Sequence, residues 1–289
     1  MQRVFVLFTL GVSCLLTTPI FAGPIYNNLT PNNSMAVATR PDTSAFEIEA
    51  GDDFFVGAQT SITSASFVGL YVPGTAGAPA ISSLVAEIYR VFPQDSNTAR
   101  TPNVLTRVNS PSDVAFDSRD SASSGLTFTT TVLSNTFVTL NSVQPGGIHP
   151  FPNQTTGGDG SLTGQEVRID VSFLTPFNLP ANHYFFVPQV QLTNGGQFYW
   201  LSASRPISGA GTTPFPSGVT DLQAWTRDAA LDPDWSRVGT DIVGGTPPPT
   251  FNMAFSLDGA VVPEPGSVVS GLTGLSLIGL GLAFRTRQK

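Results

Sequence analysis

The dominant pattern between residues 23 and 260 is an alternation of apolar and polar positions with a period of two. In Val167–Phe173, four apolar residues alternate with three polar ones. Phe251–Leu257 repeats the pattern, with its large apolar residues on one face and smaller residues opposite. Successive side chains of a β-strand point to opposite faces, so this period predicts strands with one buried face.

Further segments of this kind recur along the chain, separated by stretches rich in Gly and Pro. The other predicted strands are Ile62–Val72, Leu84–Phe92, Leu126–Leu140, Tyr184–Leu192, Gln197–Ser202 and Leu222–Arg227. Long amphipathic helices are hard to find. Short strands with frequent turns predict an all-β fold for residues 23–260, called the body below. We expect an antiparallel β-sandwich of the jelly-roll type.

Two long loops are predicted within the body, Gln144–Gly164 and Ser208–Gly218, because both are rich in turn-forming residues. Loops of this length are often functional, although a tolerated surface insertion is the simpler interpretation. Phenylalanine is the most frequent aromatic residue, with 21 copies, and supplies core volume where charge is scarce.

Basic residues are rare in the body, which has nine arginines, no lysine and nineteen acidic residues, a formal charge of −10. Nucleic acids and anionic membrane surfaces attract clustered basic residues, so we expect neither as a partner. An acidic surface suits solvation or the binding of divalent cations.

The first 22 residues resemble a secretory signal peptide. Arg3 precedes the apolar run Val4–Leu16, and Ala22 provides a small residue for cleavage. The run is shorter than the roughly 20 residues of a membrane span. We therefore expect secretion and removal by signal peptidase. Cys14, the single cysteine, lies inside the run, and lipidation there is an alternative without the usual preceding leucine.

The C-terminus carries a second apolar segment. Ser267–Phe284 contains no charged residue, and as a helix its eighteen residues would span about 27 Å, close to the thickness of a bilayer. Arg285, Arg287 and Lys289 follow it. Basic flanks resist translocation, so this end is expected on the cytoplasmic side of a transmembrane helix.

Just before this segment lies the motif Pro263-Glu264-Pro265, whose prolines keep the chain extended. The motif, the apolar segment and the basic end together resemble the PEP-CTERM sorting signal of Gram-negative bacteria. The resemblance implies that residues 261–289 form a sorting tail recognised by exosortase, a membrane cysteine protease. It also implies export across the inner membrane, transient anchoring there, and a final place in the envelope, at the surface or in a biofilm matrix of exopolysaccharide. A plain C-terminal membrane anchor is the alternative.

Residues for catalysis are few. His149 and His183 are the only histidines, and no nucleophile elbow, zinc motif or phosphate loop occurs. A pair of carboxylates for glycoside hydrolysis stays open, because such pairs converge only in space. The glutamates of the body are Glu47, Glu49, Glu87 and Glu166. We therefore expect a non-catalytic structural protein, with a polysaccharide-acting hydrolase as an alternative.

Calcium is the one cofactor that the sequence suggests as an alternative to none, because calcium takes clustered oxygen ligands from loops. The aspartates that are close in sequence are Asp113, Asp117 and Asp120, and Asp228, Asp232 and Asp234. Neither group has the spacing of a known calcium loop, and turn-forming aspartates on a solvated surface are the simpler explanation.

Carbohydrate binding is the other function that the body suggests, because exported β-sandwiches stack aromatic rings on sugars. Tyr199, Trp200, Trp225 and Trp235 are the candidates, although a Trp in a strand usually packs in the core. Trp235 follows a predicted Asp-Pro-Asp turn and is expected to be exposed. The alternative function is thus an exopolysaccharide-binding module, with or without calcium.

Overall fold

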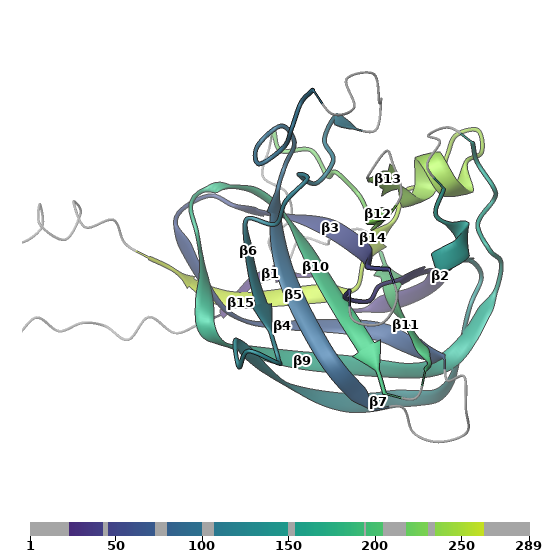
Figure 1. The fold of residues 1–289 in the computed structure, drawn as a ribbon, viewed down its shortest axis with the longest axis horizontal. Helices are drawn as coiled ribbons and strands as arrows, with labels where there is room; N and C mark the ends of the chain where they lie inside the picture. Colours follow the sequence, from purple (N-terminus) through teal and green to yellow (C-terminus); the bar gives the residue numbers. More distant parts are fainter. Residues whose placement is uncertain are drawn as a thin grey trace, which may run out of the picture.

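The structure is a computed structural model, which describes residues 23–42, 46–72, 80–99, 107–149, 154–193, 195–204, 218–230 and 235–262. These residues are mostly β-strand, with almost no helix, and form two sheets (Figure 1). The predicted all-β class is therefore confirmed. The expected signal peptide with Ala22, the sorting motif and the tail through Lys289 lie outside the described residues. Within them, no helix has the length and apolarity needed to cross a membrane.

The larger sheet has nine strands and is curled into a half-barrel. Its strands are β1 (Gly23–Asn27), β2 (Pro31–Ala38), β4 (Thr60–Val72), β7 (Leu126–Thr139), β8 (Ser142–Val143), β9 (Leu162–Leu179), β11 (Gln197–Ala203), β14 (Asn252–Met253) and β15 (Phe255–Val261). The long strand β4 pairs with β9 along one side. Along its other side, residues 60–67 pair with β15 and residues 69–72 pair with β11. All pairs are antiparallel except β2 with β8. β7 pairs with β9 and forms an edge of the sheet.

The smaller sheet is antiparallel and has six strands in the order β13-β12-β3-β10-β5-β6. Their bounds are β3 (Ile48–Val56), β5 (Ile81–Arg90), β6 (Asp117–Asp120), β10 (Asn182–Leu192), β12 (Trp225–Asp228) and β13 (Ser236–Arg237). A short 3-10 helix, Pro145–Gly147, and a π-helix, Val238–Val243, complete the described secondary structure.

The main core fills the space between the two sheets, and β5 and β10 cross in front of β15 and β4 in Figure 1. Phe67 of β4 and Phe186 of β10 meet there with ring centroids 6.3 Å apart. Phe255 of β15 stacks on Phe186 at 5.5 Å and meets the edge of Trp200 at 5.6 Å. Buried aromatic rings from both sheets therefore hold the layers together, as the high phenylalanine content predicts.

The predicted strands agree with the observed ones in position but less well in length. β9 starts at Leu162, within the predicted loop Gln144–Gly164, and β12 starts at Trp225 rather than Leu222. The predicted loop Ser208–Gly218 lies outside the described residues except for Gly218. Strands β1, β2 and β3 were not predicted. β1 is short, β2 ends in four consecutive buried apolar residues without alternation, and β3 contains buried polar residues.

The outer face of the smaller sheet is also covered. A second apolar cluster packs on it, composed of Tyr89, Phe185, Val187, Trp225 and Trp235. Gly51 of β3 lies beneath Trp235, and a Cβ atom there would lie 3.8 Å from the indole ring and 3.1 Å from the Val187 side chain. The missing side chain thus gives the indole room to approach the sheet.

Candidate functional site

The alternation of β3 distributes acidic side chains to both faces of the smaller sheet. Ile48, Ala50 and Phe54 belong to the main core, whereas Glu49 and Asp53 point to the outer face. Both carboxylates are fully buried. The second apolar cluster packs on the same face of the sheet. The outer face therefore holds charge away from water, which makes it the candidate site.

Three of the four glutamates of the body converge at one end of this face. Glu47 precedes β3, Glu49 lies in β3, and Glu87 lies in β5, which β10 separates from β3. One carboxylate oxygen from each lies within 4.8 Å of the others. Gln189 of β10 donates to Glu47 Oε1 at 2.8 Å. Carboxylates at this spacing could hold a divalent cation.

Glu49 is the centre of a network within this glutamate cluster. The Nε atom of Arg227 donates to Glu49 Oε2, and the Tyr89 hydroxyl donates to Glu49 Oε1 at 2.6 Å. Arg227 Nη2 in turn donates to the Tyr89 oxygen at 3.2 Å, and Glu87 Oε2 lies 3.1 Å from that oxygen. The buried charge of Glu49 is therefore balanced by a guanidinium group of the protein itself.

Burial, followed by the charges of Glu49 and Glu47, raises the pKa of Glu87 to about 8. Burial and the charge of Glu49 also raise the pKa of Glu47. Glu87 therefore retains a proton at neutral pH and can donate it to the Tyr89 oxygen. Two neighbouring carboxyl groups are what glycoside hydrolysis needs, but fully buried Glu49 cannot reach a sugar ring.

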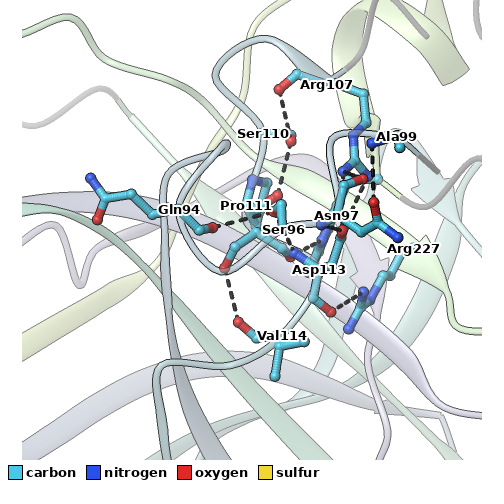
Figure 2. A network of polar contacts seen from close by, with 12 residues as sticks. Gln94, Ser96, Asn97, Ala99, Arg107, Ser110, Pro111, Asp113, Val114 and Arg227 are labelled. Carbon is cyan, nitrogen blue, oxygen red and sulfur yellow. Dashed lines mark hydrogen bonds and ion pairs between the residues drawn. The ribbon is translucent and has the colours of Figure 1, made fainter. Parts of the chain in front are cut away.

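Figure 2 shows the polar contacts of residues 94–99 and 107–114, which follow β5 and are called the covering loop below, and their contact with Arg227. Arg107 Nη1 pairs with Asp113 Oδ1 at 2.6 Å, and the backbone N–H of Asn97 donates to Asp113 Oδ2 at 2.7 Å. The Asp113 N–H donates to Ser96 Oγ at 3.0 Å, and the Asp113 carbonyl accepts from Arg227 Nη1 at 3.2 Å. One aspartate thus ties the covering loop to the guanidinium that neutralises Glu49.

The aromatic side chains expected to bind sugars do not form an exposed platform. Tyr199, Trp200, Trp225 and Trp235 are all buried, so the prediction that Trp235 is exposed is wrong. Its indole N–H donates to the Ser112 carbonyl at 3.0 Å, and the Arg227 guanidinium lies 4.7 Å from its ring. The covering loop shields the ring, and the local turn motif in the sequence does not indicate this contact.

The aspartates expected to bind calcium are dispersed among local contacts. Asp113 pairs with Arg107, Asp117 pairs with Arg119, and Asp120 accepts the backbone N–H of Ser123 at 2.6 Å. Asp228 Oδ1 accepts the Ala230 N–H at 2.9 Å. Its expected co-ligands Asp232 and Asp234 lie outside the described residues. For the four described aspartates, the contacts agree with turn and ion-pair roles.

A small pocket opens at the other end of the outer face. It has a volume of about 340 Å³, and Phe55, His183, Thr220 and Leu222 are among the residues that line it. His183 Nε2 lies 2.5 Å from Asp53 Oδ2, which also accepts the Leu222 N–H at 3.0 Å. An imidazole held by a buried carboxylate could move a proton to or from a small polar molecule in this pocket.

Sequence reasoning could not find the Glu49 network or the Asp53–His183 pair, because the members of each are far apart in the chain. Asp53 and His183 are 130 positions apart and meet because β10 pairs His183 with Phe55. Glu49 and Arg227 face each other because β12 pairs with β3. The scarcity of glutamate in an acidic body was the one available signal, since three of the four lie together.

Comparisons with known proteins add no relative to this description. No protein-family model, no curated protein and no solved structure matches this chain.

Proposed function

We propose that this chain is an exported, non-catalytic structural protein of the cell surface or extracellular matrix, sorted by exosortase through Pro263-Glu264-Pro265. The position of the two ends of the body gives the main support. β1 starts at Gly23, next to the expected cleavage site Ala22, and Gly23 pairs with Gly259 of β15. β15 ends at Val261, just before the motif. Both expected membrane segments are therefore attached to the same end of the body.

This arrangement suits a protein that crosses the inner membrane and stays attached to it for a time. The signal peptide and the tail would lie in one membrane, and the body would fold beside it. Because both segments leave the body at the same end, neither has to run along the body to reach the membrane. We extend the proposal to the architecture, a jelly-roll-like sandwich, because two facing sheets share one aromatic core.

The sorting motif can be tested by replacing Pro263-Glu264-Pro265 with three alanines in the native host. We expect the wild-type chain to lose its tail and to reach the surface fraction, and the variant to keep its tail in the inner membrane. Intact-mass spectrometry identifies the C-terminus, and Val262→Ala is the control next to the motif. A wild-type chain that keeps its full tail at the surface would contradict the proposal.

The edge strand β7 supports a structural role. Its fourteen residues, LTFTTTVLSNTFVT, include no charge and no proline, and Val132, Leu133 and Val138 are exposed. Such an edge offers unpaired backbone groups to another strand. The partner we propose is a second copy of this chain, because two bodies with a charge of −10 repel each other least along an uncharged strand.

Association along β7 predicts that the full chain in mild detergent sediments as more than one copy. Val132→Lys should return it to the monomer, whereas Val108→Lys, at another exposed valine outside the sheet, should not. A monomeric wild-type chain would exclude the edge as an assembly surface and leave the sorting test unaffected.

The two alternative functions predict different results with exopolysaccharide from the host. We expect neither retention on the polymer nor shortening of it. Retention would favour a carbohydrate-binding module. Shortening that His183→Gln abolishes would favour a hydrolase that uses the pocket beside Asp53.

A further inference from the structure

A second group of polar side chains lies on the opposite face of β3, within the main core. Asp52 is fully buried there, and its Oδ2 accepts the Met253 N–H of β14 at 2.7 Å. β3 and β14 belong to different sheets, so Asp52 links the two layers. Its second oxygen, Oδ1, has no hydrogen-bond partner.

Two further side chains complete this group. Asn252, also in β14, is buried, and its Nδ2 donates to Asp221 Oδ2 at 3.1 Å. The Asn252 Oδ1 has no hydrogen-bond partner. Asp221 lies in the segment before β12, and its charge raises the pKa of Asp52, after the larger effects of burial and Asp53. The three side chains are thus connected through β14, where Asn252 bonds to Asp221 and the adjacent Met253 N–H bonds to Asp52.

This group lacks the compensation that buried charge normally has. Among the described residues, no Arg or His forms an ion pair with Asp52, in contrast to Glu49 with Arg227. An unsatisfied buried polar atom costs about 1–3 kcal/mol, and native proteins contain few of them. Protonation of Asp52 would remove its charge and turn one oxygen into a hydrogen-bond donor, but it would leave the charge of Asp221 in place. A bound cation would satisfy both oxygens and both carboxylates.

We propose that Asp52, Asp221 and Asn252 form a calcium site that joins β3, the segment before β12 and β14. Carboxylate and amide oxygens are the ligands that calcium takes, and its flexible coordination suits groups from three segments. The negative charge of the body raises the local cation concentration. The site is separate from the glutamate cluster and from Asp228, and it does not depend on the sorting tail.

The test uses the full chain in mild detergent, stripped of metal with a chelator and melted with calcium chloride or magnesium chloride. Calcium at about 100 times its dissociation constant should shift the folding equilibrium about 100-fold, or about 2.7 kcal/mol. For a body of this size that is a rise of about 5–10 °C in Tm. Magnesium, which prefers a rigid octahedral shell, should have a much smaller effect.

Terbium provides a local readout of the same site. After the larger effect of burial, the charges of Asp52, Asp53 and Asp221 raise the pKa of Tyr26, so this tyrosine is the expected sensitiser of a lanthanide bound there. Terbium emission excited through aromatic residues should appear on titration and should disappear when calcium is added in excess.

Asp52→Asn keeps the shape of the side chain and removes its charge. The calcium-free variant should melt no lower than the wild-type chain, because a buried charge is lost, but calcium should no longer raise its Tm. If this variant does not fold, the half-buried Asp221→Asn should weaken the calcium response at least about tenfold. Glu87→Gln, in the glutamate cluster, is the matched control and should keep the full response.

Three results would overturn the site. The wild-type chain could show no calcium-dependent shift and no terbium emission that calcium displaces. The response could survive in Asp52→Asn and Asp221→Asn. It could also be lost in Glu87→Gln, which would place the cation on the outer face of the sheet instead.

Discussion

Replacing Arg227 with Met tests whether the outer-face network depends on one guanidinium group. Arg227 pairs with fully buried Glu49, donates to the Tyr89 hydroxyl and holds the Asp113 carbonyl of the covering loop. Met has a similar length and fills the same apolar surroundings beside Trp235. The substitution therefore removes the charge and its hydrogen bonds while leaving most of the packing in place.

The magnitude follows from what is left behind. Removing one partner of a buried ion pair typically costs 3–5 kcal/mol, because the other charge stays buried without compensation. The lost contact between the guanidinium and the Trp235 ring, at 4.7 Å, adds up to about 2 kcal/mol. We expect Arg227→Met to lower the free energy of unfolding by about 3–7 kcal/mol in all, a large part of the stability of an ordinary domain.

Urea unfolding at neutral pH, followed by tryptophan fluorescence, measures this loss. The double variant Glu49→Gln/Arg227→Met removes both charges and should recover more than half of it, which a double-mutant cycle expresses as a coupling energy. A loss below about 1 kcal/mol in the single variant would show that the pair is not the main support of the covering loop. A double variant as unstable as the single one would show that packing, not charge, explains the loss.

The remaining predictions concern single side chains. The raised pKa of Glu87, about 8 against 4.5, means that its contribution to stability is fully present below pH 4.5 and is lost as the pH rises to about 8. Glu87→Gln should therefore flatten the fall in stability over this window, and urea midpoints measured across it that still decline would contradict the assignment. Phe255→Ala should cost about 3–5 kcal/mol, because it empties the centre of the main core, and a loss below about 2 kcal/mol would indicate looser packing than the structure shows. Trp235→Ala should lower the free energy of unfolding by a similar amount, measured as a lower Tm. Because its ring is buried, the variant and the wild-type chain should behave alike on exopolysaccharide.

The fold class was predictable because alternation is a local property. Val167, Ile169, Val171 and Phe173 are buried as the pattern predicts, and they lie in the long strand β9. Strand pairing was not predictable in the same way. β4 has β15, β11 and β9 as neighbours, and nothing within its own sequence selects them. Local patterns identify strands, whereas the choice of partner depends on packing across the whole body.

The candidate groups deviate from the pattern that identified the strands. Asn252 alternates with large apolar residues and would be placed on a solvated face, yet it is buried. Asp52 and Asp53 interrupt the alternation of β3, so that strand escaped prediction although both carboxylates are buried. Residues that break the rule of apolar inside and polar outside were the ones that sequence reasoning could not place, because their partners come from distant segments.

The location of β15 determines how the body responds to mechanical load. This strand continues directly into the tail and lies between β1 and β4, hydrogen-bonded on both sides. A force applied through the tail acts along the strand, so the bonds to both neighbours resist it together in shear rather than opening one at a time from an edge. Phe255 and Leu257 would have to leave the core in the same step. A body held at this strand can therefore resist a force applied beyond Val261 with a slow rate of forced unfolding.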